Sequence, residues 1–181
     1  MSGARRYLIY GVTGSGKTVL AKRLAERTAL PFFLVDDLTW LPGWVPVGEE
    51  EQRALIDELT ARDAWVVDSA YSKWLDLPLA RADVIVALDY PRWVSLWRVT
   101  RRSLLRAIDR RPICGGNVET WRRLVSRDSM IHWHFHSFAR KRARIRAWVA
   151  NPPGPQVVLL SSPQQARKWL DSVQPDAPDP L

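Results

Sequence analysis

The sequence predicts one α/β domain in which a five-stranded, mainly parallel sheet carries helices on both faces. Five short apolar runs alternate with longer segments whose apolar residues recur at helical spacing, and this alternation is typical of a parallel sheet. The chain has 181 residues, of which 46% are hydrophobic, so it is long enough to bury a core without disulfides or metals. The five runs are residues 7–10, 32–35, 65–67, 84–88 and 157–160.

The segments between these runs set the expected helices and loops. Helices are expected at residues 17–30, 49–62, 91–108, 120–150 and 164–170, the fourth with a break near residues 126–129. Residues 38–47 and 110–117 contain prolines and glycines and are predicted to be loops. We expect residues 1–173 to form the domain and residues 109–128 to form a short, Arg-rich lid within it. The Pro/Asp-rich residues 174–181 are predicted to be a disordered tail.

The positive charge of the chain is concentrated in one segment. The chain has 27 Lys and Arg residues against 19 Asp and Glu, and residues 98–146 hold 14 of these basic residues against 3 acidic ones. Such a local excess fits either a nucleic-acid surface or a clamp for a small phosphorylated ligand. The single cysteine, Cys114, has no disulfide partner, and no segment has the pattern of a signal peptide or a membrane span. A cytoplasmic protein without a membrane partner is therefore expected.

A glycine-rich turn follows the first apolar run and precedes the first expected helix. It matches the pattern G-x-x-x-x-G-K-[ST] at every fixed position. Its backbone N–H groups would converge on a phosphate, Lys17 would reach the β- and γ-phosphates, and the Thr18 hydroxyl would bind Mg²⁺. The alternative is a plain turn that carries Lys-Thr by chance. We therefore expect a P-loop NTPase three-layer fold that binds a nucleoside triphosphate through Gly11, Val12, Thr13, Gly14, Ser15, Gly16, Lys17 and Thr18.

Further motifs accompany this phosphate loop. They are Asp36-Asp37-Leu38-Thr39-Trp40 with Pro42-Gly43-Trp44, Val67-Asp68-Ser69-Ala70-Tyr71-Ser72, and Leu88-Asp89-Tyr90-Pro91-Arg92-Trp93 followed by Arg98, Arg101 and Arg102. With these motifs the chain, from about Tyr7 to Leu170, resembles the P-loop nucleoside monophosphate kinases, and among them the small adenylate-kinase-like proteins called DNA topology modulation proteins. The resemblance implies a kinase-like fold that binds ATP with Mg²⁺ and transfers its γ-phosphoryl group to a small acceptor, either a nucleotide or a hydroxylated metabolite.

Two aspartates that follow apolar runs are candidates for the chemistry. Asp36 and Asp68 would emerge at the carboxyl edge of the sheet, where ligands of such folds bind. The resemblance to small kinases gives Asp36 the acceptor hydroxyl, with Asp37 as its substitute. Asp68 is the better Walker-B-like partner of Thr18 and Mg²⁺. Either aspartate could instead cap the turn after its strand, and for Asp89 the favoured role is to cap the helix that follows.

The acceptor is expected to lie between residues 40–44 and residues 71–74, whose aromatic side chains are either its walls or plain core. Adenylate kinases carry a Gly-x-Pro-Arg run after the aspartate that corresponds to Asp68, whereas this chain has Ser69-Ala70-Tyr71-Ser72. No arginine stands there to hold a monophosphate. A small hydroxylated acceptor is therefore favoured over a nucleotide.

Arg98 and Arg102 are four residues apart on one expected helix and therefore point to the same side. The pair matches the arginines that enter the lid of adenylate-kinase-like enzymes, and guanidinium groups there would neutralise charge on the transferring phosphoryl group. Arg101 and Arg106 fall off this line and are expected to be solvated. Further lid or helix candidates are Arg110, Arg111, Arg127, Arg140 and Arg144. The predicted catalytic set is Lys17, Asp36, Arg98 and Arg102.

Three histidines and the basic segment leave other functions open. His132 and His136 would face the same way on one helix and His134 would not, and two histidines without a nearby acidic or cysteine ligand are too few for zinc. Packing or pocket polarity is therefore their favoured role. The alternative function is a nucleic-acid-associated P-loop NTPase that uses residues 98–146 as its binding surface. A third is a regulatory nucleotide-binding domain without turnover. The first two differ in whether the arginines face the nucleotide or point outward.

Overall fold

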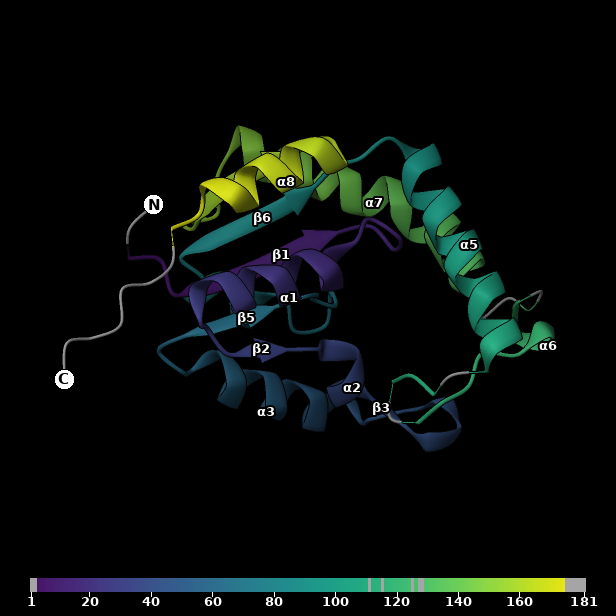
Figure 1. Ribbon diagram of the computed structural model, residues 1–181. Coiled ribbons are helices and arrows are strands. Elements are labelled where there is room, and N and C mark those ends of the chain that lie inside the picture. The colour runs from purple at the N-terminus through teal and green to yellow at the C-terminus, as the bar shows by residue number, and fades with distance from the viewer. Residues whose placement is uncertain (1–2, 111, 115, 125, 127–128, 175–181) are drawn as a thin grey trace.

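The computed structural model describes residues 3–110, 112–114, 116–124, 126 and 129–174, and a five-stranded sheet lies at its centre (Figure 1). The strand order is β2-β5-β1-β6-β7, and every neighbouring pair is parallel. The sheet is therefore the five-stranded one that the sequence predicts, and it is parallel throughout. Its strands are β1 (Arg6–Gly11), β2 (Phe32–Phe33), β5 (Trp65–Val67), β6 (Val84–Leu88) and β7 (Gln156–Leu160).

The other regular elements of the described chain are helices and one small hairpin. The hairpin consists of β3 (Trp40–Leu41), the single 3₁₀ turn η1 (Pro42–Trp44) and β4 (Val45–Pro46). The helices are α1 (Lys17–Thr28), α2 (Val35–Thr39), α3 (Glu49–Thr60), α4 (Asp76–Arg81), α5 (Arg92–Asp109), α6 (Trp121–Leu124), α7 (Met130–Ala150) and α8 (Pro163–Ser172). None of them is both long and apolar enough to cross a membrane, as far as the described residues go.

The side chains of β1 alternate between two cores. Tyr7 and Ile9 are buried on one face of the sheet, with apolar side chains of α1 and α8. Leu8 and Tyr10 are buried on the other, with side chains of α3 and α7, and the Tyr10 ring meets the edge of Trp148 at a centroid distance of 4.7 Å. A strand that is covered on both faces has no polar side, which explains the unbroken apolar runs of the sequence.

Helices α5 and α7 pack against each other, and Figure 1 shows α5 beyond the carboxyl ends of the strands. The buried face of α5 consists of Ser95, Val99, Ser103 and Ala107, which recur every fourth residue. These side chains are small, so α5 lies close to its neighbours. The same helix therefore stands next to the phosphate loop and can direct side chains of its adjoining face towards it.

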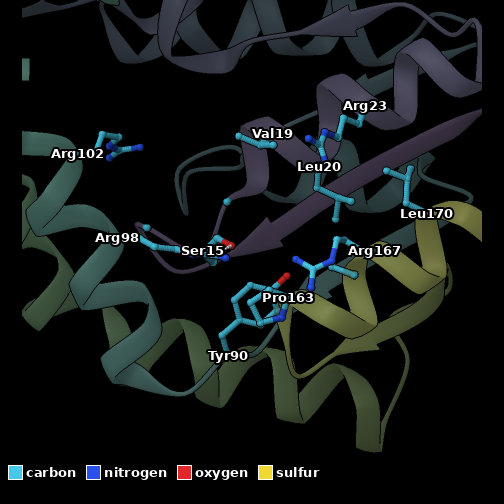
Figure 2. Close-up of a pocket in the computed structure, with 13 residues that line it drawn as sticks. Ser15, Val19, Leu20, Arg23, Tyr90, Arg98, Arg102, Pro163, Arg167 and Leu170 are labelled. Carbon is cyan, nitrogen blue, oxygen red and sulfur yellow. Dashed lines mark hydrogen bonds between the residues drawn. The ribbon is translucent and has the colours of Figure 1, made fainter. Parts of the chain in front are cut away.

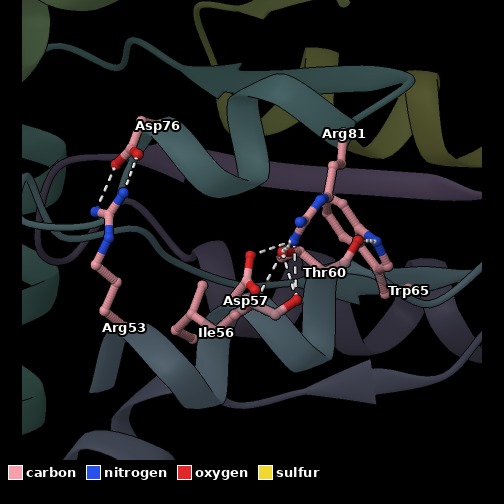
Figure 3. Close-up of polar contacts among 7 residues, drawn as sticks. All are labelled: Arg53, Ile56, Asp57, Thr60, Trp65, Asp76 and Arg81. Carbon is pink, nitrogen blue, oxygen red and sulfur yellow. Dashed lines mark hydrogen bonds and ion pairs between the residues drawn. The ribbon is translucent and has the colours of Figure 1, made fainter. Parts of the chain in front are cut away.

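Polar contacts fix the short helix α4 against α3, an element that the sequence analysis missed (Figure 3). Arg53 of α3 forms a two-pronged ion pair with Asp76, and the Arg81 guanidinium donates a hydrogen bond of 2.8 Å to the Thr60 hydroxyl. The indole N–H of Trp65 donates to the Thr60 carbonyl at 3.3 Å. These contacts anchor the segment that leads out of β5 towards the site.

Several expected boundaries are corrected by the structure. The second strand ends at Phe33, because the chain turns into α2 at Val35. Asp36 and Asp37 therefore lie in the first turn of a helix rather than at the end of a strand. The expected loop at residues 38–47 contains the β3–β4 hairpin. The long helix expected at residues 120–150 is two helices, α6 and α7, as the predicted break implied.

Asp89 does not cap α5, so that interpretation was wrong. Pro91 stands at the start of α5 without a capping side chain, and Asp89 accepts a 2.9 Å ion-pair contact from Arg142 of α7 instead. Arg146 approaches the same carboxylate at 3.9 Å. Two predicted lid residues, Arg111 and Arg127, and residues 175–181 of the predicted tail lie outside the described residues.

Candidate functional site

The phosphate loop connects β1 to α1 and is shaped by its glycines. Gly14 and Gly16 have φ of 81° and 94°, the left-handed region that side chains disfavour. The Ser15 N–H and hydroxyl both donate to the Val12 carbonyl, at 3.2 and 2.8 Å. A Cβ on Gly14 would overlap the carbonyl oxygen of Ser95, so the loop packs tightly against α5. The loop is compact and packed, and it leads directly into the N-terminus of α1, where backbone N–H groups favour an anion.

Lys17 is the first residue of α1 and folds back over the loop. Its ammonium donates to the Val12 carbonyl at 3.0 Å. Burial lowers the pKa of Lys17, and Arg102 lowers it further, whereas the carboxylates of Asp68 and Asp36 raise it. The Lys17 ammonium is therefore close enough to the carboxylates of Asp68 and Asp36 to interact with their charges.

Thr18 and Asp68 meet at the carboxyl edge of the sheet. The Thr18 hydroxyl donates to one oxygen of Asp68 at 2.6 Å, and the Val35 N–H donates to the other at 3.1 Å. Burial raises the pKa of Asp68, whereas these two hydrogen bonds lower it. A hydroxyl and a carboxylate in contact are the oxygen donors that Mg²⁺ prefers, so this pair fits the predicted metal site.

Asp36 lies beyond Asp68, on α2. One of its oxygens accepts a 2.6 Å hydrogen bond from the Tyr71 hydroxyl. Burial raises the pKa of Tyr71 well above its ordinary value, and the charge of Asp36 raises it further, so the hydroxyl stays a donor. Asp37 is exposed, whereas Asp36 is partly buried and bonded to Tyr71, so Asp36 is the better positioned of the two.

Arg98 and Arg102 point to the same side of α5, as predicted, and both line one cavity of about 340 Å³ (Figure 2). Arg98 donates to the Ser15 carbonyl of the phosphate loop at 3.1 Å. Burial lowers the pKa of Arg102, and Nε of this side chain has no hydrogen-bond partner in the described part of the chain. The cavity is lined by Gly14, Ser15, Gly16, Val19, Leu20, Arg23, Tyr90, Arg98, Arg102, Pro163, Ala166, Arg167 and Leu170.

Glu119 is an acidic residue next to these arginines that the sequence analysis did not single out. It is buried, accepts a hydrogen bond of 3.1 Å from Ser103, and lies 4.0 Å from Arg106. Its charge also raises the pKa of Arg102. Arg106 is thus an ion-pair partner rather than a solvated residue, which corrects the expectation for it. Arg101 is exposed, as expected.

The segment after α5 is bound to the β3–β4 hairpin. The Asn117 side chain accepts the Trp44 N–H at 2.6 Å and donates to the Leu41 carbonyl at 2.9 Å. The Trp44 indole donates to the Val118 carbonyl at 3.3 Å, and Arg123 lies 4.0 Å above the Trp44 ring. The predicted lid segment and the Trp-rich hairpin therefore meet.

Two further basic residues reach the site from α7. Lys141, which the sequence analysis did not single out, lies with its ammonium 3.5 Å from the Gly11 carbonyl. Arg144, a predicted helix candidate, lies 3.3 Å from the Tyr10 hydroxyl and 3.5 Å from the Ser72 hydroxyl. Arg140 is exposed. The spacing of residues 141 and 144 places them on one face, but only the packing of α7 reveals that this face meets the phosphate loop.

The three histidines lie on α7, and Cys114 lies in the segment after α5. His132 and His136 are exposed and share a 2.8 Å contact between their Nε2 atoms, whereas His134 is buried and lies 2.9 Å from the Ser95 hydroxyl. No group of three or more metal-binding side chains occurs among the described residues. Burial and the charge of Asp36 raise the pKa of the Cys114 thiol to about 11, which makes it a poor nucleophile.

Comparison with known proteins supports the fold. Residues 7–68 match the model of the ATPase family associated with various cellular activities (AAA), a stretch that contains the phosphate loop and Asp68. No curated protein matches the sequence. In three dimensions the chain resembles a gluconokinase from Sinorhizobium meliloti, with a TM-score of 0.55, 18% identity and 94% of each chain covered.

Two other solved structures also have a similar fold. A shikimate kinase from Acinetobacter baumannii in complex with shikimate has a TM-score of 0.57 at 16% identity, with 94% of this chain and 90% of that one covered. A sugar kinase from Janibacter sp. has a TM-score of 0.51 at 20% identity, with 93% of each covered. The chain has the P-loop NTPase fold. This fold implies nucleotide binding, and the similar structures are kinases of small metabolites. The adenylate-kinase-like group within the fold stays a prediction.

Proposed function

We propose that the protein is a kinase that transfers the γ-phosphoryl group of ATP to a small hydroxylated acceptor. The observation that carries the proposal is the arrangement around the phosphate loop, with Thr18 and Asp68 in contact at 2.6 Å and Arg98 bonded to the loop from the other side. The fold supports it, because the similar structures are named for kinases of gluconate, shikimate and a sugar. The likeness to adenylate kinases that we propose is limited to the arginine pair of α5, because Ser69-Ala70-Tyr71-Ser72 departs from the adenylate kinase pattern.

On the nucleotide side, the backbone N–H groups of the loop would bind the phosphates. Lys17 would exchange its hydrogen bond to the Val12 carbonyl, at 3.0 Å, for the β- and γ-phosphates. The base and ribose would occupy the 340 Å³ cavity between α1, α5 and α8, where Tyr90 and Pro163 offer flat apolar surfaces.

Thr18 and Asp68 would hold Mg²⁺, directly and through water. When bound, the ion neutralises charge on the phosphates and fixes their geometry. The protein's own contribution is the 3.1 Å hydrogen bond from the Val35 N–H, which orients the Asp68 carboxylate towards Thr18.

Asp36 would accept the proton of the acceptor hydroxyl, and Arg98 and Arg102 would neutralise the charge that develops on the phosphoryl group in transfer. Arg102 is suited to this because its Nε has no hydrogen-bond partner among the described residues. The negative charge of Glu119, which also lies 4.0 Å from Arg106, would attract the Arg102 guanidinium and help to position it.

The alternative of a nucleic-acid surface on residues 98–146 is less well supported. Arg98 and Arg102 line the cavity, and Arg142 and Arg146 approach the Asp89 carboxylate. These four cations are thus directed inward or paired, whereas a nucleic-acid surface needs them outward. We further propose one domain over residues 1–173, with residues 109–128 as its lid, and a cytoplasmic location, the latter because the chain has a single cysteine.

An ATP-consumption assay with Mg²⁺ tests the proposal across nucleoside monophosphates, nucleosides, sugars and hydroxy acids. Turnover is expected with a hydroxylated acceptor. Lys17→Met should weaken ATP binding or turnover by about 10- to 150-fold, the value of one charged hydrogen bond. Lys22→Met, which removes a charge from the exposed face of the same helix, is the control. Full activity in the Lys17 variant would remove the phosphate loop from the mechanism.

A further inference from the structure

The acceptor side of the phosphate loop holds two cations without a carboxylate partner. Lys141 and Arg144 lie on one face of α7, and no carboxylate of the described residues lies within 4 Å of either. Their contacts are with neutral oxygens, at 3.5 Å from Lys141 to the Gly11 carbonyl and at 3.3 Å from Arg144 to the Tyr10 hydroxyl. On the neighbouring face of the same helix, Arg142 has a carboxylate partner, Asp89, at 2.9 Å.

Among the described residues, the ammonium of Lys141 has only weak, neutral partners. It lies over the Tyr10 ring, 5.7 Å from the centroid, and a 3.5 Å hydrogen bond is weak. Burial lowers its pKa to about 7, with Lys17, Arg140 and Arg144 adding to the effect and Asp36 opposing it. Both side chains are half-buried and have only neutral partners in the part of the chain that the structure describes, so an anion placed between Lys141 and Arg144 would be favoured.

The two cations share their surroundings with Asp36. The Tyr71 hydroxyl is bonded to Asp36 at 2.6 Å, and the next residue, Ser72, lies 3.5 Å from Arg144. The charge of Asp36 acts on both Lys141 and Lys17. A carboxylate that can accept a hydroxyl proton, a lysine of the phosphate loop and two unpaired cations therefore border the same side.

We propose that the acceptor is a small hydroxylated anion, a hydroxycarboxylate or a sugar phosphate, whose anionic group binds Lys141 and Arg144 while one hydroxyl faces Asp36. This rests on the proposed kinase function. In the transfer, the acceptor oxygen forms a bond to the γ-phosphorus, the bond from that phosphorus to the β–γ bridging oxygen breaks, and the hydroxyl proton passes to Asp36. The products are the phosphorylated anion and ADP.

The test measures binding by calorimetry, with the full chain, Mg²⁺ and a non-hydrolysable ATP analogue present. The probes are gluconate and glycerate as hydroxycarboxylates, glucose 6-phosphate as a sugar phosphate, AMP as a nucleotide, and glucose and glycerol as their neutral counterparts. At least one of the first three should bind, and the neutral compounds should not. Gluconate against glucose 6-phosphate distinguishes a carboxylate from a phosphate as the recognised group.

Variants of α7 assign the binding to the two cations. Lys141→Met and Arg144→Met should each weaken binding of the anion by about 10- to 100-fold, as the loss of one charged hydrogen bond does, with little change in affinity for the ATP analogue. Arg146→Met removes an exposed charge from the same helix and should change neither. Lys141→Arg should retain most of the affinity. Anion affinity of the wild type should fall as the pH rises through about 7, whereas the arginine variant should show no such fall.

Separate outcomes overturn the inference and the kinase function. Absence of binding by all three hydroxylated anions, tight binding of neutral glucose or glycerol, preference for AMP, or unchanged anion affinity in both methionine variants would each overturn the anion site. The kinase function fails on a different result, namely anion binding with the expected variant effects but no ADP production from ATP under the same conditions.

Discussion

The proposed nucleotide side and the proposed acceptor side of the phosphate loop are built in different ways. Around the 340 Å³ cavity, four arginines from α1, α5 and α8 face an open space, and Arg98 is held by the Ser15 carbonyl and the Tyr90 ring (Figure 2). On the acceptor side, beside Lys141 and Arg144, several polar groups are bonded to one another, as with Tyr71 and Asp36, or Asn117 and Trp44.

This difference predicts different costs of binding. The base and ribose of a nucleotide would enter an open cavity, and among the residues named for the nucleotide side only Lys17 has to release a hydrogen bond, so nucleotide binding is largely preorganised. An acceptor must displace hydrogen bonds that residues on its side already make with one another, such as the one between Tyr71 and Asp36. Substitutions on the nucleotide side should therefore lose activity outright, whereas breaking an internal contact on the acceptor side can improve acceptor binding.

Removal of an arginine of α5 is expected to have the largest effect. Arg98→Ala or Arg102→Ala should lower kcat by about 10²- to 10⁵-fold, the range for arginines that stabilise phosphoryl transfer, with a smaller effect on nucleotide Kd. Lysine should restore little, because an ammonium lacks the planar two-pronged contact. Single-turnover ATP cleavage measures the effect, and Arg101→Ala on the exposed side of α5 is the matched control. Intact turnover in both alanine variants would end the catalytic assignment.

The packing of the phosphate loop on α5 gives the next largest effect. Gly14→Ala places a Cβ against the Ser95 carbonyl and strains a residue with φ of 81°, so ATP affinity should fall by about tenfold or more and stability by about 1–3 kcal/mol. Gly48→Ala is the control, because nothing lies within 4 Å of its added Cβ. Calorimetric Kd and urea unfolding check the two effects. Equal results for the two glycines would contradict the close packing of loop and helix.

On the acceptor side, Tyr71→Phe sharpens the comparison because the expected change has the opposite sign. Removing the hydroxyl frees Asp36 from a 2.6 Å hydrogen bond that the acceptor must otherwise displace. The KM of the acceptor should fall about two- to tenfold, the value of one hydrogen bond, with little change in the KM of ATP. A higher acceptor KM would instead mean that the Tyr71 hydroxyl binds the acceptor directly.

The last expected effect concerns stability rather than activity. Burial lowers the pKa of His134, and Arg92 lowers it further, so the folded protein keeps this imidazole neutral. The resulting stability is fully present above the unfolded pKa of about 6.5 and is lost as the pH falls below that value and through the lower pKa of the folded state. His134→Gln should cost about 1–2 kcal/mol at pH 7.5 and flatten the fall in unfolding free energy between pH 7 and 5, whereas His132→Gln on the exposed face should do neither. An unchanged slope in the His134 variant would contradict this role.

The sequence predicted the parts of the molecule that follow from local pattern. The phosphate loop, all five sheet strands and the helix that bears Arg98 follow from residue type and spacing, and α5 begins and ends within about a residue of the prediction. Helix α4 was missed because its six residues, which include Pro78, show no helical period. Contacts with α3 fix the helix instead, from Arg53 of α3 to Asp76 and from Arg81 to Thr60 of α3.

Residues whose role depends on a distant partner were harder to predict. Lys141 stands in a run of basic residues, and nothing in that run distinguishes the side chain that meets Gly11 from Arg142, which meets Asp89. Asp89 looked like a helix cap because the sequence shows its neighbour Pro91 but not the arginines of α7. Tertiary packing decided these roles, and spacing alone carried no signal of them.

The parallel sheet also constrains when the phosphate loop can form. Strand β1 lies at the centre of the sheet but comes first in the described chain, and its two partners begin at Trp65 and Val84. Parallel pairs of such large sequence separation form slowly, because a long loop must close before any contact is gained. During synthesis the glycine-rich turn is therefore exposed and without its framework until β6 has been made. A nucleotide added to refolding protein should stabilise late, sheet-containing states and leave the earliest collapse unaffected.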